Sequence, residues 1–135
     1  MIVREVISAL RSYPEDLPMA AYSSHAEKPG EIENIVSCNN IIEEDRSFLV
    51  FRTSMYEGKS AAEVIGILLE HDESFIVAYD PFGFTFAYDL VECNTVRKVK
   101  CIKKKKTFHD IMDHTNYTEA VYKVSWRGRE MLLIR

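Results

Sequence analysis

One cluster of residues in the sequence has the spacing of metal ligands, His109-Asp110-x-x-Asp113-His114. On a helix, His109 and Asp113 would lie one turn apart and point the same way, as chelation by two ligands requires. The alternative is structural, because Thr107 to Asp110 also fits the capped, acidic first turn of a short third helix. We predict no bound cofactor, and keep His109, Asp113 and His114 only as candidates for the centre of a small metal-dependent hydrolase.

A second cluster is basic. It consists of lysines from a predicted strand and two arginines near the C-terminus: Lys98, Lys100, Lys103, Lys104, Lys105, Lys106, Arg127 and Arg129. Such a run can hold phosphates by releasing condensed counterions, but lysines also protect the edge of a sheet from pairing with other chains. The formal net charge of -4 gives no global attraction to nucleic acid, so binding would need this local patch. Nucleic-acid or nucleotide binding is therefore one alternative function.

A third candidate is a clamp for a carboxylate or phosphate made by Arg127, Arg129 and Arg135 with Trp126, because guanidinium groups bind these anions in a fork. The alternative is an ordinary exposed turn, since Arg127-Gly128-Arg129 has the composition of one.

Two further groups are candidates for binding another protein. The first is an acidic run that would face a basic partner: Glu43, Glu44 and Asp45. The second is aromatic and belongs to a predicted hairpin with its turn: Phe82, Phe84, Phe86 and Tyr88. Alternation along a strand places every second side chain on one face of the sheet. That face is either buried within the chain or a surface for self-association, for example as a homodimer.

Recognised catalytic motifs do not occur in the sequence. There is no phosphate-binding loop, no G-x-S-x-G motif and no cysteine in an activating pattern. The three cysteines, Cys38, Cys93 and Cys101, lack C-x-x-C spacing and predict free thiols in a reducing cytoplasm. The longest apolar runs are too short to span a membrane. We therefore predict a cytoplasmic protein that is not an enzyme and has no membrane partner.

Two helix–strand units are expected to carry the fold. Apolar residues recur at i, i+3, i+4 and i+7 from Val3 and again from Ala61, which predicts a helix over about 2–13 and another over about 60–70. The first should end before Pro14. Ser60 and Glu63 form a capping box at the second, whereas Ile2 has no hydroxyl to make one with Glu5. Each helix precedes an apolar segment ending in Ala-Tyr, at 19–22 and 76–79.

The remaining predicted elements are mainly strands. They are expected at 31–38, before a break at Asn39-Asn40, then at 48–52, 84–90 after a turn at 80–83, and 94–103. A hairpin with strands at 120–126 and 131–134 should close the chain. We predict a single α+β domain, 1–135, with a mainly antiparallel sheet, two main helices and a short third helix. Residues 1–56 and 57–106 form two pseudo-repeated halves, by duplication or by coincidence, before a C-terminal hairpin at 117–135.

The N-terminal part resembles small proteins encoded by phages and prophages. Such proteins open with a helix of the V-x-E-[LV]-I-x-x-L type, followed by a Pro-Glu-Asp turn, a strand, and an I-x-x-V strand. The likeness covers residues 2–52 and is carried by Val3-Arg4-Glu5-Val6-Ile7, Leu10, Pro14-Glu15-Asp16, Ile32 and Ile35-Val36. The threonine that often caps this helix is replaced by Ile2.

The resemblance implies a phage-type protein that acts in the cytoplasm of a bacterial host. It brings no catalytic motif, so we expect a non-enzymatic inhibitor that binds a host protein and works by occlusion. A component of a host defence system, such as a CRISPR nuclease, is the kind of target that such a protein would have.

Overall fold

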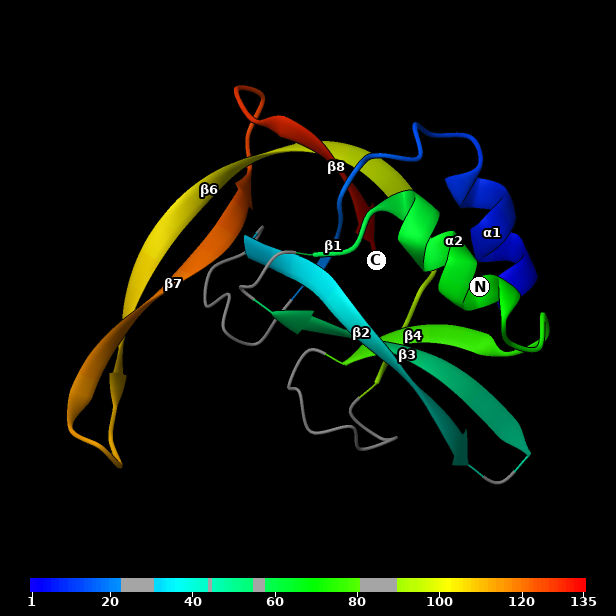
Figure 1. Ribbon diagram of the computed structural model, residues 1–135, viewed down its shortest axis with the longest axis horizontal. Coiled ribbons are helices and arrows are strands. Elements are labelled where there is room, and N and C mark those ends of the chain that lie inside the picture. Colours follow the sequence, from blue (N-terminus) through cyan, green and yellow to red (C-terminus); the bar gives the residue numbers. More distant parts are fainter. Residues whose placement is uncertain (23–30, 44, 55–57, 81–89) are drawn as a thin grey trace.

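The computed structural model describes residues 1–22, 31–43, 45–54, 58–80 and 90–135 (Figure 1). Two helices occur within them, α1 (Val3–Leu10) and α2 (Ala61–Leu69). Both were predicted, and each buries the apolar stripe that predicted it: Val3, Val6 and Leu10 in α1, and Ala61, Val64 and Leu68 in α2. Neither helix has the length and apolar character needed to cross a membrane.

Eight strands are described: β1 (Met19–Tyr22), β2 (Glu31–Glu43), β3 (Arg46–Ser54), β4 (Ile76–Asp80), β5 (Val91–Glu92), β6 (Val96–Asp110), β7 (Thr115–Val124) and β8 (Arg129–Ile134). They are hydrogen-bonded in the order β1-β8-β6-β7-β2-β3-β4-β5, and β1 also pairs with β2. The α+β class is confirmed. The sheet is mixed, because β1 runs parallel to β8 and β3 runs parallel to β4 among otherwise antiparallel pairs.

Three sequence predictions are wrong in the part of the chain that the structure describes. The third helix is absent, because β6 continues to Asp110 and residues 111–114 form its turn into β7. Asn39-Asn40 does not break β2, since both residues pair with β3. β7 and β8 do not pair with each other, so they form no C-terminal hairpin; both pair with β6. In each case the pairing of strands outweighs a weak local signal. The predicted strand at 84–90 lies outside the described ranges except for residue 90, which belongs to no strand.

The first turn of each helix is hydrogen-bonded to the segment that follows the other helix. The N–H of Val3 donates to the carbonyl of Phe75 at 2.8 Å, and the N–H of Ala61 donates to the carbonyl of Leu17 at 2.9 Å. The next residues repeat the arrangement: the N–H of Arg4 donates to the carbonyl of Glu73, and the N–H of Ala62 donates to the carbonyl of Glu15. The two sets are related by a shift of 58 residues: donors 3 and 4 correspond to 61 and 62, and acceptors 15 and 17 correspond to 73 and 75. N–H groups in the first turn, which have no partner inside their own helix, are satisfied in this way.

The strands after the helices follow the same correspondence. Ala20 of β1 pairs with Asn34, and Ala78 of β4 pairs with Glu92. Ala20 is therefore structurally equivalent to Ala78. Aligning the two Ala-Tyr endings would instead match Ala21 with Ala78, so the structural alignment differs from the sequence alignment by one residue. Duplication as the origin of this likeness stays a prediction.

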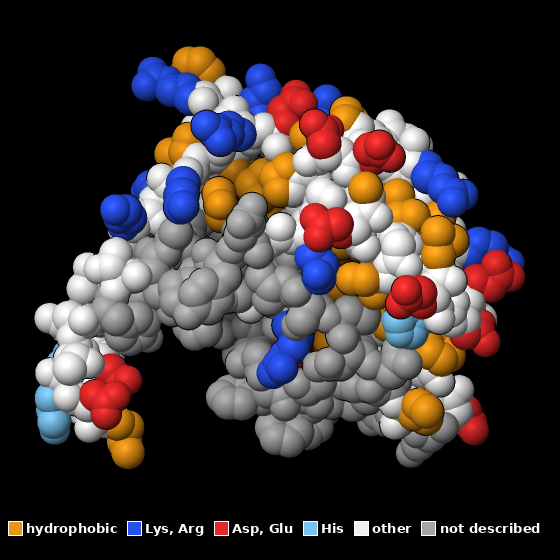
Figure 2. Space-filling view, in the orientation of Figure 1, with side chains coloured by type: hydrophobic (Ala, Val, Ile, Leu, Met, Phe, Trp, Pro, Cys, Tyr) orange, Lys and Arg blue, Asp and Glu red, His pale blue; other side chains and the backbone are white. Residues whose placement is uncertain are grey.

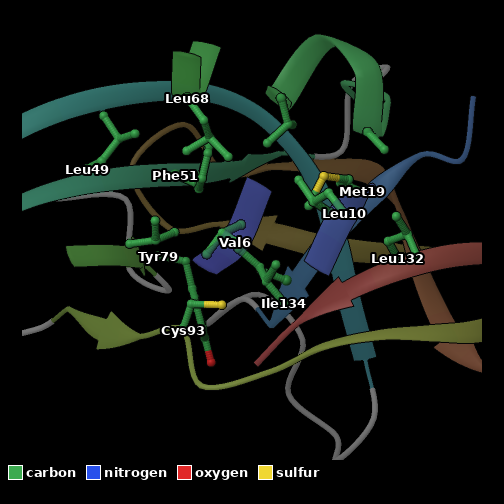
Figure 3. Close-up of a cluster of buried hydrophobic side chains, with 14 of the residues drawn as sticks. Val6, Leu10, Met19, Leu49, Phe51, Leu68, Tyr79, Cys93, Leu132 and Ile134 are labelled. Atoms are coloured by element: carbon green, nitrogen blue, oxygen red, sulfur yellow. The ribbon is translucent and has the colours of Figure 1, made fainter. Parts of the chain in front are cut away.

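The main core lies between the two helices and the sheet. Figure 3 shows Val6 and Leu10 of α1 and Leu68 of α2 directed toward side chains of the strands, among them Phe51 and Ile134. Alternate residues of β1 and β8 face the other way and form a second buried cluster: Ala20, Met131 and Leu133, joined by Cys101 of β6. This second cluster is the floor on which the candidate site is built.

Candidate functional site

The positive charge of this acidic chain is concentrated in its last forty residues. Residues 96–135 contain 11 of the 17 Lys and Arg residues but only four of the 21 Asp and Glu residues. In Figure 2 the Lys and Arg side chains gather on the upper left, over β6 and the turn between β7 and β8, while most visible Asp and Glu side chains lie on the other side. The net charge of the whole chain therefore hides a strongly basic surface.

β6 and β7 continue as a two-stranded ribbon beyond the body of the protein. β8 pairs with β6 only over residues 96–101, and β2 pairs with β7 only at Tyr122 and Lys123. From Lys104 to Asp110, β6 pairs with β7 alone among the described strands, and the ribbon projects to the lower left in Figure 1. Side chains on both faces of the ribbon are consequently open to solvent where the structure describes them.

The predicted lysines are spread along β6. Lys103, Lys104 and Lys105 are exposed at the base of the ribbon and form no ion pair with any residue that the structure describes. Lys103 and Lys105 share one face because side chains alternate, and Lys104 lies on the other. Lys98 and Lys100 lie nearer the body, where the ammonium of Lys98 is 3.5 Å from the carboxylate of Glu130. Of Lys106, only the backbone is described.

The chain crosses over β6 between β7 and β8. Cys101 is the register partner of both Val124 in β7 and Arg129 in β8, so residues 125–128 must pass from one edge of β6 to the other. The N–H of Ser125 donates to the carbonyl of Lys100 at 2.7 Å, which anchors the start of this crossing. The crossing carries Arg127 and Arg129 onto the same part of the surface as Lys103.

Gly128 makes this close passage sterically feasible. A Cβ atom at this position would lie 2.2 Å from the carbonyl carbon and oxygen of Cys101, well inside van der Waals contact. A residue without a side chain is therefore needed where the crossing touches the strand.

A cavity of about 520 Å³ opens beside the crossing. Its floor includes Cys101, Tyr122 and Met131, and its rim carries the three cationic side chains of Lys103, Arg127 and Arg129. The structure thus brings together three candidates of the basic cluster that are up to 26 positions apart in the sequence. The apolar floor was not identified from the sequence. The signal for it in the sequence is the alternation of Met131 and Leu133 along β8, which places both side chains on one face of the sheet.

The thiol on the floor of this cavity is not set up for nucleophilic chemistry. Burial raises the pKa of Cys101 to about 11, so the thiol stays protonated near neutral pH. Cys101 therefore contributes apolar surface to the cavity.

Trp126 lies at the exposed side of the crossing. Its side chain is 78% exposed, and the guanidinium carbon of Arg127 lies 4.7 Å from the centre of the ring. This is the geometry of a cation–π contact. The contact between Arg127 and Trp126 is therefore one part of the predicted clamp, and it faces solvent.

The proposed metal ligands do not form a helical pair. His109 lies in β6, where its Nδ1 is 3.0 Å from the amide oxygen of Asn116, while Asp113 and His114 belong to the ribbon turn. The turn is held by Asp110, which accepts the N–H of Met112 and of Asp113. Among the described residues, no three His, Cys, Asp or Glu side chains come together as metal ligands would. The one-turn spacing assumed for His109 and Asp113 is wrong.

The predicted protein-binding residues are only partly described. Glu43 is the strand-register partner of Arg46 at the end of the β2–β3 hairpin, and Asp45 is exposed there. Ile42, next to them, is 77% exposed. Glu44 and the aromatic residues Phe82, Phe84, Phe86 and Tyr88 lie outside the described ranges.

Comparison of the chain with protein-family models, curated proteins and solved structures found no match.

Proposed function

We propose that this protein is a non-enzymatic binding protein and that its basic C-terminal surface binds nucleic acid. The supporting observation is the convergence of Lys103, Arg127 and Arg129 around one cavity, continued by lysines along the ribbon. These side chains come from two segments that meet only because the chain crosses β6.

The arrangement suits a polyanion better than a single phosphate group. Lys103 and Lys105, on one face of β6, are separated by about 7 Å along the strand. Arg127 of the crossing and Arg129 of β8 add two cations at the cavity that Lys103 also lines. Several phosphates in line could be contacted at once, which is how non-specific nucleic-acid affinity arises.

Salt dependence of binding tests the proposal. Binding of a fluorescently labelled oligonucleotide, followed by anisotropy, should weaken steeply as salt rises, with a log–log slope of about -0.7 to -0.9 for each phosphate contacted. Lys103→Ala with Lys105→Ala should weaken binding and make the slope shallower by about one to two units. Arg4→Ala with Arg11→Ala removes the same charge from the two ends of α1 and serves as the matched control. Absence of binding at low salt, or equal losses in both double variants, would refute the proposal.

A second candidate function is the binding of a basic host protein at the end of the β2–β3 hairpin. The observation in its favour is the exposed Ile42 beside the exposed carboxylate of Asp45, because interfaces often combine an apolar contact with complementary charge. This is the inhibitor hypothesis that the phage-protein resemblance implies. Pull-down from a bacterial lysate, with mass spectrometry, should recover a protein that the Ile42→Ser, Asp45→Lys variant fails to retain.

A further inference from the structure

We infer that the nucleic acid bound at this surface is single-stranded and that one of its unpaired bases stacks on Trp126. This inference rests on the proposed function and specifies its ligand. It starts from a large apolar ring that the chain holds in water, although aromatic side chains usually bury most of their surface.

The tryptophan is held by an anchored turn. The crossing is fixed to β6 by the hydrogen bond from Ser125 to Lys100, and it is closed by the N–H of Gly128, which donates to the carbonyl of Ser125 at 3.0 Å. The N–H of Arg127 lies 3.4 Å from the hydroxyl oxygen of Ser125. Because the backbone on both sides of Trp126 is anchored by these hydrogen bonds, binding at the ring has little backbone left to order.

The ring and its neighbouring side chains can contact both the base and the phosphate of a nucleotide. A base can stack on the indole, since every base has a flat π-face. The guanidinium of Arg127, already over the ring, places a positive charge where an adjoining phosphate would lie. Arg129 and Lys103 add two more cations around the adjacent cavity, whose apolar floor suits a second unpaired base.

Stacking distinguishes a single strand from a duplex. In a duplex the face of each base is covered by its neighbours, and only base edges and phosphates are accessible. A ring that projects from the surface therefore gains contact with a single strand, where bases can be splayed out. Charge alone would not make this distinction.

Trp126 is the only tryptophan in the chain, so its fluorescence reports directly on the site. Oligothymidylate of about 16 nucleotides, a length within common single-strand site sizes, should quench this fluorescence and bind more tightly than a duplex of equal length. Oligouridylate in a parallel titration separates RNA from DNA. Trp126→Ala should weaken single-strand binding by about 5- to 150-fold and leave the salt slope unchanged, while Trp126→Phe retains most of the affinity.

The outcomes separate this inference from the proposed function. If oligonucleotides bind with a steep salt dependence but without quenching, or bind no better than duplex, base stacking on Trp126 is wrong and the proposed function stands. If neither form of nucleic acid binds, the proposed function fails as well. Quenching or a blue shift with anionic lipid vesicles alone would overturn the inference in favour of a membrane surface. Thermal unfolding of Trp126→Ala should match the wild type, because the side chain is exposed.

Discussion

Gly128 lies directly against the backbone of Cys101, so close that a Cβ atom on the glycine would be 2.2 Å from the carbonyl carbon of the cysteine. The contact locks the crossing turn onto β6 and sets the position of the cavity, of Arg127 and of Trp126. Stability and binding should therefore depend on the same small residue.

Replacement of this glycine should harm both properties. Gly128→Ala forces the crossing away from the strand and should cost about 1–3 kcal/mol, the usual penalty for overpacking. Urea unfolding should show a lower midpoint at an unchanged m value. Gly66→Ala is the control: Gly66 is exposed in α2 with no atom within 4 Å of its added Cβ, so the variant should gain up to about 1 kcal/mol of stability. Equal stability of the two alanine variants would contradict the role given to Gly128.

Neighbouring leucines at the end of α2 should behave in opposite ways. Leu68 is fully buried in the main core, whereas Leu69 is 61% exposed. Leu68→Ala should destabilise the protein by about 2–5 kcal/mol, since it removes buried contacts and leaves a cavity. Leu69→Ala should change stability by less than about 0.5 kcal/mol. Chemical unfolding of both variants checks the orientation of α2, and comparable losses would mean that the helix faces the core differently.

The cap of α2 should be measurable by pH. Ser60 Oγ accepts the N–H of Glu63, and the carboxylate of Glu63 accepts the N–H and hydroxyl of Ser60. The backbone hydrogen bond from Ser60 lowers the pKa of Glu63 below 4.5. Stability from this pair is therefore present above pH 4.5 and is lost as the pH falls through the folded-state pKa.

Removal of the titrating carboxylate should remove that pH dependence. Glu63→Gln should flatten the acid limb of the stability curve, because no group at the cap then changes its charge. Ser60→Ala is the comparison: it should cost about 1 kcal/mol at neutral pH but keep part of the acid limb, because the N–H of residue 60 still donates to Glu63. An acid limb as steep in Glu63→Gln as in the wild type would rule out the linkage.

The buried thiols should be unreactive in the native state. Burial raises the pKa of Cys93, and raises the pKa of Cys101 from 9.0 to about 11. In a Cys38→Ser variant, the two remaining thiols should react with a disulfide reagent at pH 8 only after unfolding, because thiolate and access are both lacking. Stability linked to Cys101 is fully present below pH 9 and declines as the pH rises toward about 11, and Cys101→Ala should lose that decline. Prompt labelling of native protein would contradict this account.

Local patterns were enough to predict the helices, whereas the pairing of the strands decided the rest. The apolar period of 3–10 and 61–68 and the Ser60 cap need only neighbouring residues, so both helices were correct. The carboxylate of Glu5 nevertheless accepts the N–H of Ile2 at 2.9 Å, which is half of a capping box although Ile2 has no hydroxyl. The ribbon was missed because Thr107 to Asp110 has a plausible helix start, which pairing with residues 115–118 overrides.

The sequence was enough to predict which residues contribute to the candidate site, but not where in the structure they meet. Lys103 and Arg127 were both identified from sequence as basic candidates, yet nothing in their spacing shows that they share a cavity. Their proximity depends on β7 and β8 lying on opposite edges of β6. A final hairpin was the simpler reading of the same residues, because two strands joined by a four-residue turn usually pair with each other.

The hydrogen bonds from the start of each helix to the segment after the other helix have a consequence for synthesis on the ribosome. α1 has eight residues, too few to persist alone in water, and its partners at Glu73 and Phe75 are made some seventy residues later. The first helix should therefore remain unformed in the nascent chain until the second helix and its exit have emerged. Ordering of the two is then a joint event, and a truncated product that stops before residue 73 should be degraded as an unfolded polypeptide.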